Sequence, residues 1–117
     1  MKSWESNSWT ILYCDSVDEI RDALSNQEFM WPLILRGIEW LIEEERSSTM
    51  ILEGRLSDGN DVIWVSISND EVPTTIQKMI DWRLSREEYE ECAIATACLE
   101  RWQTREMAQH RRNSTLI

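Results

Sequence analysis

The sequence predicts an α+β fold in which a small antiparallel sheet is covered by helices and a long C-terminal helix follows. Two runs of alternating apolar residues flank an Asp-Gly pair, which is the pattern of a β-hairpin. Four further segments carry apolar residues at helical spacing, so the expected element order is β-α-α-β-β-α-α. The 117 residues suffice for one domain, 1–117, with mobile ends expected at 1–7 and 113–117.

The first half of the chain predicts one strand and two helices. Residues 9–14 (WTILYC) are rich in β-branched and aromatic side chains, as strands are. Ser16 and Glu19 form a capping box, which predicts a helix that ends near Ser25 and Asn26. A second helix is expected from about Pro32 to Arg46, because proline suits a first helical turn.

Residues 49–68 predict the hairpin, with the turn at Asp58-Gly59. Alternation places Ile63, Val65 and Ile67 against the helices and Trp64 on the opposite, mixed face. The preceding strand is expected to divide in the same way between two faces. Its members on one face are Met50, Leu52 and Leu56, and on the other Ile51, Glu53 and Arg55.

The last part of the chain predicts two helices. Pro73 opens one of them, and a capping box of Ser85 with Glu88 predicts that the next begins there and runs towards Arg112. This last helix would be about 40 Å long, which exceeds the expected width of the domain. Its end must project, bend, fray or pack on another chain. Residues spaced alternately three and four positions apart form a seam along this helix, which predicts a homodimer through it. The seam residues are Tyr89, Cys92, Thr96, Leu99 and Gln103.

Charge is the most unusual feature of the composition. The formal net charge is −10, from 22 acidic and 12 basic residues. Such a chain repels nucleic acid and anionic membranes and attracts basic surfaces. The expected partner is therefore a basic protein such as a nuclease or another nucleic-acid-binding protein, with no direct contact to nucleic acid or membrane.

Three cysteines, Cys14, Cys92 and Cys98, fit free thiols in a reducing cytoplasm, and the polar start of the chain does not resemble a signal peptide. Together with His110 they supply four potential zinc ligands. On one helix, however, Cys92 and Cys98 would point about 120° apart, and His110 would lie about 18 Å beyond Cys98. We therefore expect no metal and no cofactor.

The search for catalytic motifs is negative. The three glycines form no phosphate-binding loop, and neither H-E-x-x-H nor G-x-S-x-G occurs. Cys14 has no histidine that could serve as its base. The sequence therefore predicts a protein that is not an enzyme.

Acidic and aromatic side chains are the candidates for partner binding. Glu39 with Glu43, and Glu87 with Glu91, are spaced to share a helix face. Glu43 and Glu44 oppose the dipole of their own helix, so a reason outside the fold is expected for them. Glu87 and Glu91 have a simpler explanation, since helix starts favour anions. Tryptophan dominates binding hot spots, which adds Trp64 and Trp82 as contacts.

Two functions fit these observations. The first is a non-enzymatic inhibitor that binds the basic, nucleic-acid-facing surface of a protein. It would act as immunity proteins, anti-restriction proteins and anti-CRISPR DNA mimics do, by analogy of charge and size only. The alternative is an adaptor that assembles through its C-terminal helix, with no link to nucleic-acid-binding partners. Carboxylates gathered on one face favour the inhibitor, and carboxylates spread over all helices favour the adaptor.

Overall fold

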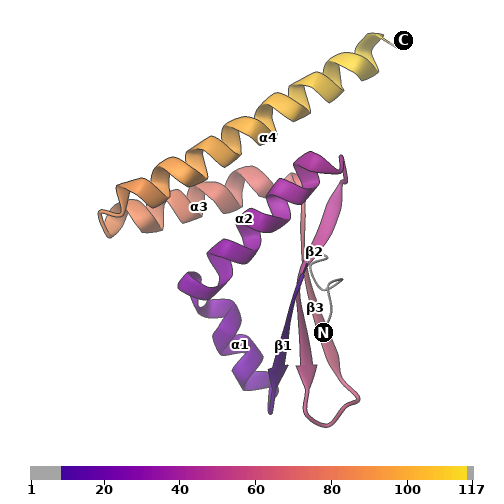
Figure 1. Cartoon of the computed structure of the whole chain (residues 1–117), viewed down its shortest axis with the longest axis vertical. Coiled ribbons are helices and arrows are strands. Elements are labelled where there is room, and N and C mark those ends of the chain that lie inside the picture. The colour runs from indigo at the N-terminus through magenta and orange to yellow at the C-terminus, as the bar shows by residue number, and fades with distance from the viewer. Residues whose placement is uncertain (1–8, 116–117) are drawn as a thin grey trace.

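The computed structural model describes residues 9–115 and confirms the α+β class and the expected element order (Figure 1). The elements are β1 (Thr10–Cys14), α1 (Val17–Ser25), α2 (Gln27–Glu43), β2 (Ser48–Leu56), β3 (Val62–Ser68), a 3-10 turn η2 (Asn69–Glu71), α3 (Val72–Ser85) and α4 (Tyr89–Thr115). The expected mobile segment 1–7 lies outside the described residues. Three residues of the expected tail 113–117 belong to α4.

The sheet is mixed rather than purely antiparallel, with the strand order β1-β2-β3. The predicted hairpin is confirmed, since β2 and β3 pair antiparallel. The expectation of an entirely antiparallel sheet was wrong, because β1 pairs parallel with β2, with Thr10 opposite Leu52. Two helices separate these strands in the chain, and a crossover of this kind returns the second strand in the direction of the first.

A β-bulge in β2 changes which side chains face the helices. Thr49 lies opposite Ile67 and Leu52 opposite Val65, so β2 contains one residue more than β3 over this stretch. Ile51 and Leu52 are consequently both buried, with 4% and 0% of their surfaces exposed. The prediction that they occupy opposite faces was wrong, because strict alternation fails where a bulge inserts a residue.

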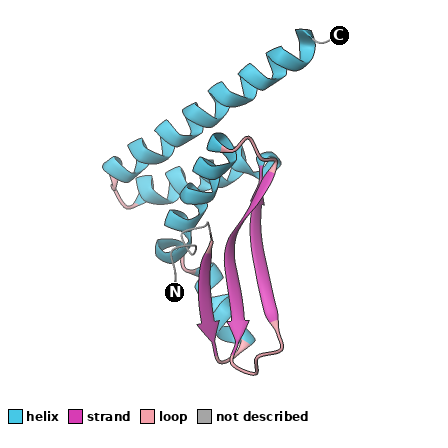
Figure 2. Cartoon of the chain, turned by 45° about the vertical axis from the view of Figure 1, so that its right-hand side comes forward, coloured by secondary structure: helices cyan, strands magenta, loops and turns pink. Residues whose placement is uncertain are grey.

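Helices α1 and α2 lie along one face of the sheet (Figures 1 and 2). The core forms between this face and the helices, and it extends to α3 and the first half of α4. Among its buried side chains are Ile38, Leu41, Leu52, Ile67, Val72, Ile76, Met79, Ala95 and Cys98. The opposite sheet face bears Trp64, which is 54% exposed and lies on the mixed face as predicted.

Two helix starts differ from the prediction. α2 begins at Gln27 because the Asn26 side chain accepts a hydrogen bond of 3.2 Å from the Phe29 amide, and Pro32 lies inside the helix. α4 begins at Tyr89, so the expected capping box at Ser85 does not form. Ser85 is instead the last residue of α3, and its hydroxyl donates to the Trp82 carbonyl at 2.7 Å.

Gly37 sets how closely α2 approaches the sheet. A Cβ atom at this position would lie 2.5 Å from Cγ2 of Ile51 and 3.2 Å from Cγ2 of Ile67. Gly54 of β2 likewise leaves room for Ile20 of α1, where a Cβ would meet the terminal Cδ1 at 2.9 Å. The helical layer and the sheet therefore meet through two glycines, one from each layer.

We expect Gly37→Ala to lower the free energy of unfolding by at least about 1 kcal/mol, because the overpacking exceeds the gain in helix propensity. Gly54→Ala is the matched control and should cost less, since the end of the Ile20 side chain can rotate away. Urea unfolding of both variants measures the difference. Equal or greater stability of Gly37→Ala would contradict the close contact.

Candidate protein-binding surfaces

The first group of candidate glutamates lies at the C-terminal end of α2. Glu39 forms an ion pair with Arg101 of α4, and Glu44 forms one with Arg46 at 2.7 Å. Glu43 is exposed, and Glu45 follows with a φ of 53°. This end of α2 thus presents carboxylates although the helix dipole disfavours negative charge there.

The second group lies at the turn between α3 and α4, which is a Schellman motif. The Glu88 amide donates to the Arg83 carbonyl, and the Glu87 amide donates to the Leu84 carbonyl, both at 2.9 Å. Glu87 occupies the left-handed position of this motif, with a φ of 58°. Glycine is usual there, because a side chain in this conformation costs about 1–2 kcal/mol.

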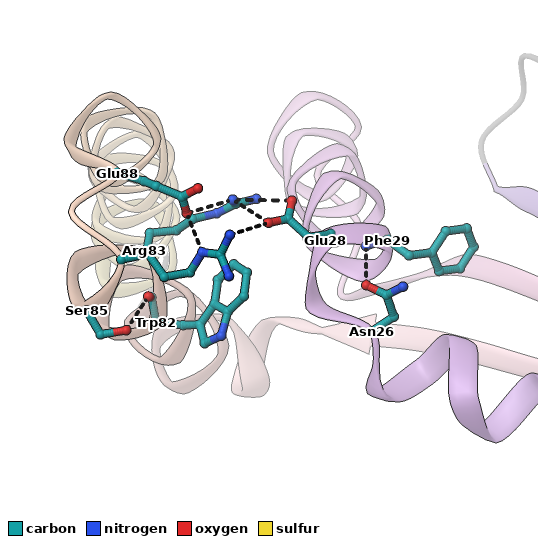
Figure 3. A network of polar contacts seen from close by, with 8 residues as sticks. Asn26, Glu28, Phe29, Trp82, Arg83, Ser85 and Glu88 are labelled. Atoms are coloured by element: carbon teal, nitrogen blue, oxygen red, sulfur yellow. Dashed lines mark hydrogen bonds and ion pairs between the residues drawn. The ribbon is translucent and has the colours of Figure 1, made fainter.

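Arg83 fixes this turn to the start of α2 (Figure 3). Its guanidinium, in a residue only 8% exposed, lies 3.1 Å from the Glu88 carboxylate and 3.4 Å from that of Glu28. Arg86 approaches the same two carboxylates at 3.2 and 3.5 Å. We call these four residues the Arg83 cluster. It joins α2, α3 and the turn before α4.

Trp82 belongs to the packing around the Arg83 cluster. The guanidinium carbons of Arg83 and Arg86 lie 4.9 and 4.6 Å from the centre of its ring, and the Trp31 ring lies 6.3 Å away. Such cation–π contacts stabilise a half-buried ring. Trp82 therefore has a structural role in the chain, whereas Trp64 is the more exposed of the two candidate tryptophans.

The candidate glutamates form two separate groups. Glu87 and Glu91 lie near Glu28 at the start of α2, since Glu28 binds the turn that precedes α4. Glu43 and Glu44 lie at the opposite end of α2, about 24 Å away at the rise of an α-helix. The structure therefore does not bring the predicted contacts together on one continuous patch.

One polar site on the mixed sheet face was missed by the sequence reasoning. Glu53 is only 3% exposed although no helix within residues 9–115 covers its face. The Trp9 indole donates to its carboxylate at 2.9 Å, and Arg55 forms an ion pair with it. The hydrogen bond to Glu53 raises the pKa of Arg55. Alternation indicated part of this cluster, because it places Glu53 and Arg55 on the same face of the strand.

The predicted dimer seam is divided between the core and solvent. Cys92 contacts the Ile80 carbonyl at 3.6 Å and Leu99 packs against the core, so neither is available to another chain. Tyr89, Thr96 and Gln103 are exposed. The seam as predicted therefore does not lie on a single free helix face.

The thiols and potential metal ligands show no convergence. Cys14, Cys92 and Cys98 are free, and burial raises the pKa of Cys98 to about 11. Among the described residues, no group of three or more His, Cys, Asp or Glu side chains could hold a metal ion. Within residues 9–115, no helix has the length and apolarity required to cross a membrane. Comparisons with protein-family models, with curated proteins and with solved structures gave no match.

The Arg83 cluster predicts a pH-dependent stability. The hydrogen bond from Arg83 lowers the pKa of Glu88 below its ordinary value. A lowered folded-state pKa contributes stability above the unfolded pKa of about 4.3, and this contribution is lost as the pH falls through the folded value. Glu88→Gln should therefore reduce stability at pH 7, and the difference from the parent should shrink below about pH 4.

Urea midpoints at neutral and acidic pH measure this difference. Glu90→Gln is the control, because Glu90 is an exposed carboxylate on the next turn. A penalty for Glu88→Gln that is independent of pH would show that the Glu88 charge does not stabilise the turn.

Proposed function

We propose that this protein is a non-enzymatic binding protein whose carboxylates contact a basic surface of another protein. The left-handed backbone of Glu87 carries this proposal. The chain retains a carboxylate at a position where glycine would relieve strain, and strained positions concentrate at functional sites. Glu43 and Glu44 likewise remain at a helix end that disfavours them.

The surroundings of Glu87 suit a protein contact. Residues 87–91 line a shallow hollow in which Tyr89 is 61% exposed. Glu87 and Glu91 are both exposed as well. Tyrosine beside exposed carboxylates offers apolar area together with acceptors for arginine or lysine, a combination suited to interfaces with basic proteins.

The separation of the two acidic groups defines the size of the partner surface. A partner that contacts both ends of α2 needs basic groups distributed over about 24 Å. This length of duplex DNA carries about seven phosphates on each strand, so the nucleic-acid-facing surface of a nuclease has suitable dimensions and charge. Inhibition by occupation of such a surface is the form of this function that we favour.

The adaptor is the second candidate, and the distribution of carboxylates favours it. Ion pairs with Arg46, Arg55, Arg83 and Arg101 involve acidic residues of α2 and its C-cap, of β2 and of the turn before α4. Carboxylates spread in this way do not form the single acidic face that was expected for a DNA mimic. A partner that binds α4 and is insensitive to the acidic residues would support the adaptor.

Glu87→Gly should increase the free energy of unfolding by about 0.5–1 kcal/mol, because glycine removes the left-handed strain but adds backbone entropy to the unfolded chain. The same variant should bind the partner more weakly. Urea unfolding measures the first effect and the association rate measures the second. A variant that is more stable but binds the partner as well as the parent would show that Glu87 does not contribute to binding.

Replacing Glu43, Glu44, Glu87 and Glu91 by glutamine should slow association with the basic partner, which can be isolated from host extract with the full chain. The matched control replaces Asp22, Asp61, Asp70 and Asp81 by asparagine and removes the same number of charges. Stopped-flow association rates of parent and variant should differ at 0.1 M salt and converge at 1 M salt, because screening shortens the Debye length from about 10 to about 3 Å. Equal slowing by both variants would indicate a general effect of net charge and no specific contact.

A further inference from the structure

Strand β3 forms an open edge of the sheet. β2 lies on one side of it, and no other strand within residues 9–115 lies on its outer side (Figure 2). Its seven residues span about 20 Å at the rise of a strand. They include neither a charged residue nor a proline, which are the usual means of keeping an edge strand from pairing. The bulge of the hairpin lies in β2 and leaves β3 regular.

The hydrogen bonds of the hairpin show which backbone groups of β3 point outward. The Leu56 amide donates to the Asp61 carbonyl at 3.1 Å, so Asp61 turns its backbone groups towards β2. In an antiparallel pair every second residue after it does the same. The residues between them turn their amides and carbonyls away from the sheet. These outward-facing residues are Val62, Trp64 and Ser66, followed by Ser68.

Glu71 closes the far end of this edge. Its carboxylate accepts hydrogen bonds from the Ser68 amide at 2.9 Å and from the Ser68 hydroxyl at 3.0 Å. The next amide, that of Asn69, points back across the sheet and donates to the Ser47 carbonyl at 2.9 Å. The open part of the edge therefore runs from Val62 to Ser66.

Side chains on both faces of β3 are incompletely covered. Val62 and Trp64, on the mixed face, are 40% and 54% exposed. Ile63 and Val65, on the helix side, are half-buried. An added strand would cover part of all four, because side chains directly opposite on neighbouring strands lie about 5 Å apart. The strand that fits this edge therefore has apolar or β-branched residues at its centre.

Acidic side chains lie at both ends of the open edge. Asp58 is exposed in the hairpin turn, where hydrogen bonds from the Asn60 and Asp61 amides lower its pKa. Glu71 is exposed beyond the other end. Two antiparallel copies of β3 would bring Asp58 of each copy towards Glu71 of the other, and this like charge opposes pairing of the strand with itself. The charges favour instead a segment with basic residues at both ends.

We propose that β3 binds an extended segment of a basic protein as a fourth strand of the sheet. The segment has apolar or β-branched residues at its centre and lysine or arginine at both ends, and its backbone pairs with Val62, Trp64 and Ser66. This inference rests on the function proposed above for the basic character of the partner, and it adds the segment that the partner contributes. Backbone hydrogen bonds supply the affinity, and the acidic ends select the charge.

A synthetic probe tests the pairing without the host partner. It has five alternating valine and threonine residues with two lysines at each end, and fluorescence anisotropy measures its binding to the full chain. Binding should be saturable, and a probe with glutamates in place of the lysines should bind at least about tenfold more weakly. A lysine probe with two adjacent prolines at its centre has the same charge and should not bind, because proline cannot donate to a strand ladder.

Amide hydrogen exchange followed by NMR locates the bound probe. Exchange should slow at Trp64 and Ser66, whose amides point outward, and remain unchanged at Ile63 and Ile67, whose amides already face β2. Protection elsewhere in place of these two amides would overturn the proposal. So would sedimentation equilibrium showing that the chain alone forms a dimer with the same two amides protected, since a second copy would then occupy the edge.

Two variants test the edge from the side of the protein. Ser66→Pro removes an outward amide and no bond to β2, so the chain should keep its circular dichroism and bind the lysine probe at least about tenfold more weakly. Asp58→Asn with Glu71→Gln keeps the local hydrogen-bond acceptors and should weaken probe binding about fivefold at 0.1 M salt. The matched control, Asp22→Asn with Asp81→Asn, should leave the affinity unchanged.

If Ser66→Pro does not fold, the charge variant and the exchange measurement decide the question. Absence of saturable binding by the lysine probe would overturn the proposal, as would equal binding of the proline-containing probe or equal weakening by the charge variant and its control. None of these measurements involves Glu43, Glu44, Glu87 or Glu91. Failure of this proposal therefore leaves the test of those glutamates unaffected, and failure of that test appears only in association with the host partner.

Discussion

The buried guanidinium of Arg83 determines how the two halves of the molecule are joined. A charge removed from water is tolerated only when it is paired and hydrogen-bonded. Here the partners come from different segments, Glu28 from the start of α2 and Glu88 from the turn before α4. One arginine and two carboxylates therefore fix the turn before α4 to the start of α2, in addition to the apolar core that α2, α3 and α4 share.

This constraint also divides the acidic residues into two classes. Glu28, Glu53 and Glu88 neutralise arginines and take part in the fold. Other acidic residues, Glu43, Glu87 and Glu91 among them, are exposed at helix ends. The net charge of −10 does not distinguish these two classes. It does not show which acidic residues contribute to folding, and it does not show that the remaining negative charge is unevenly distributed. The exposed fraction generates the field that an approaching partner meets.

Local chemistry made part of this structure predictable. The Asp-Gly turn and the alternation of residues 62–68 sufficed for the hairpin, and apolar spacing sufficed for the helices. The parallel pairing of β1, the bulge at Ile51 and the cluster around Arg83 depend on residues distant in sequence. Ser85 shows why helix starts are less predictable: its motif is satisfactory locally, but the ion pairs of Glu88 favour a different turn. Of the candidate site, the acidic positions were predictable, and the left-handed backbone of Glu87 was not.

The parallel pairing of β1 has a consequence for the order of folding. The β2–β3 hairpin closes a loop of about five residues, whereas pairing Thr10 with Leu52 closes a loop about eight times longer. The entropy of loop closure makes the second step about 2 kcal/mol more costly. During synthesis β1 leaves the ribosome before β2 and β3, yet it has no strand of this sheet to pair with until both helices and β2 have followed. The hairpin thus provides the template on which β1 completes the sheet.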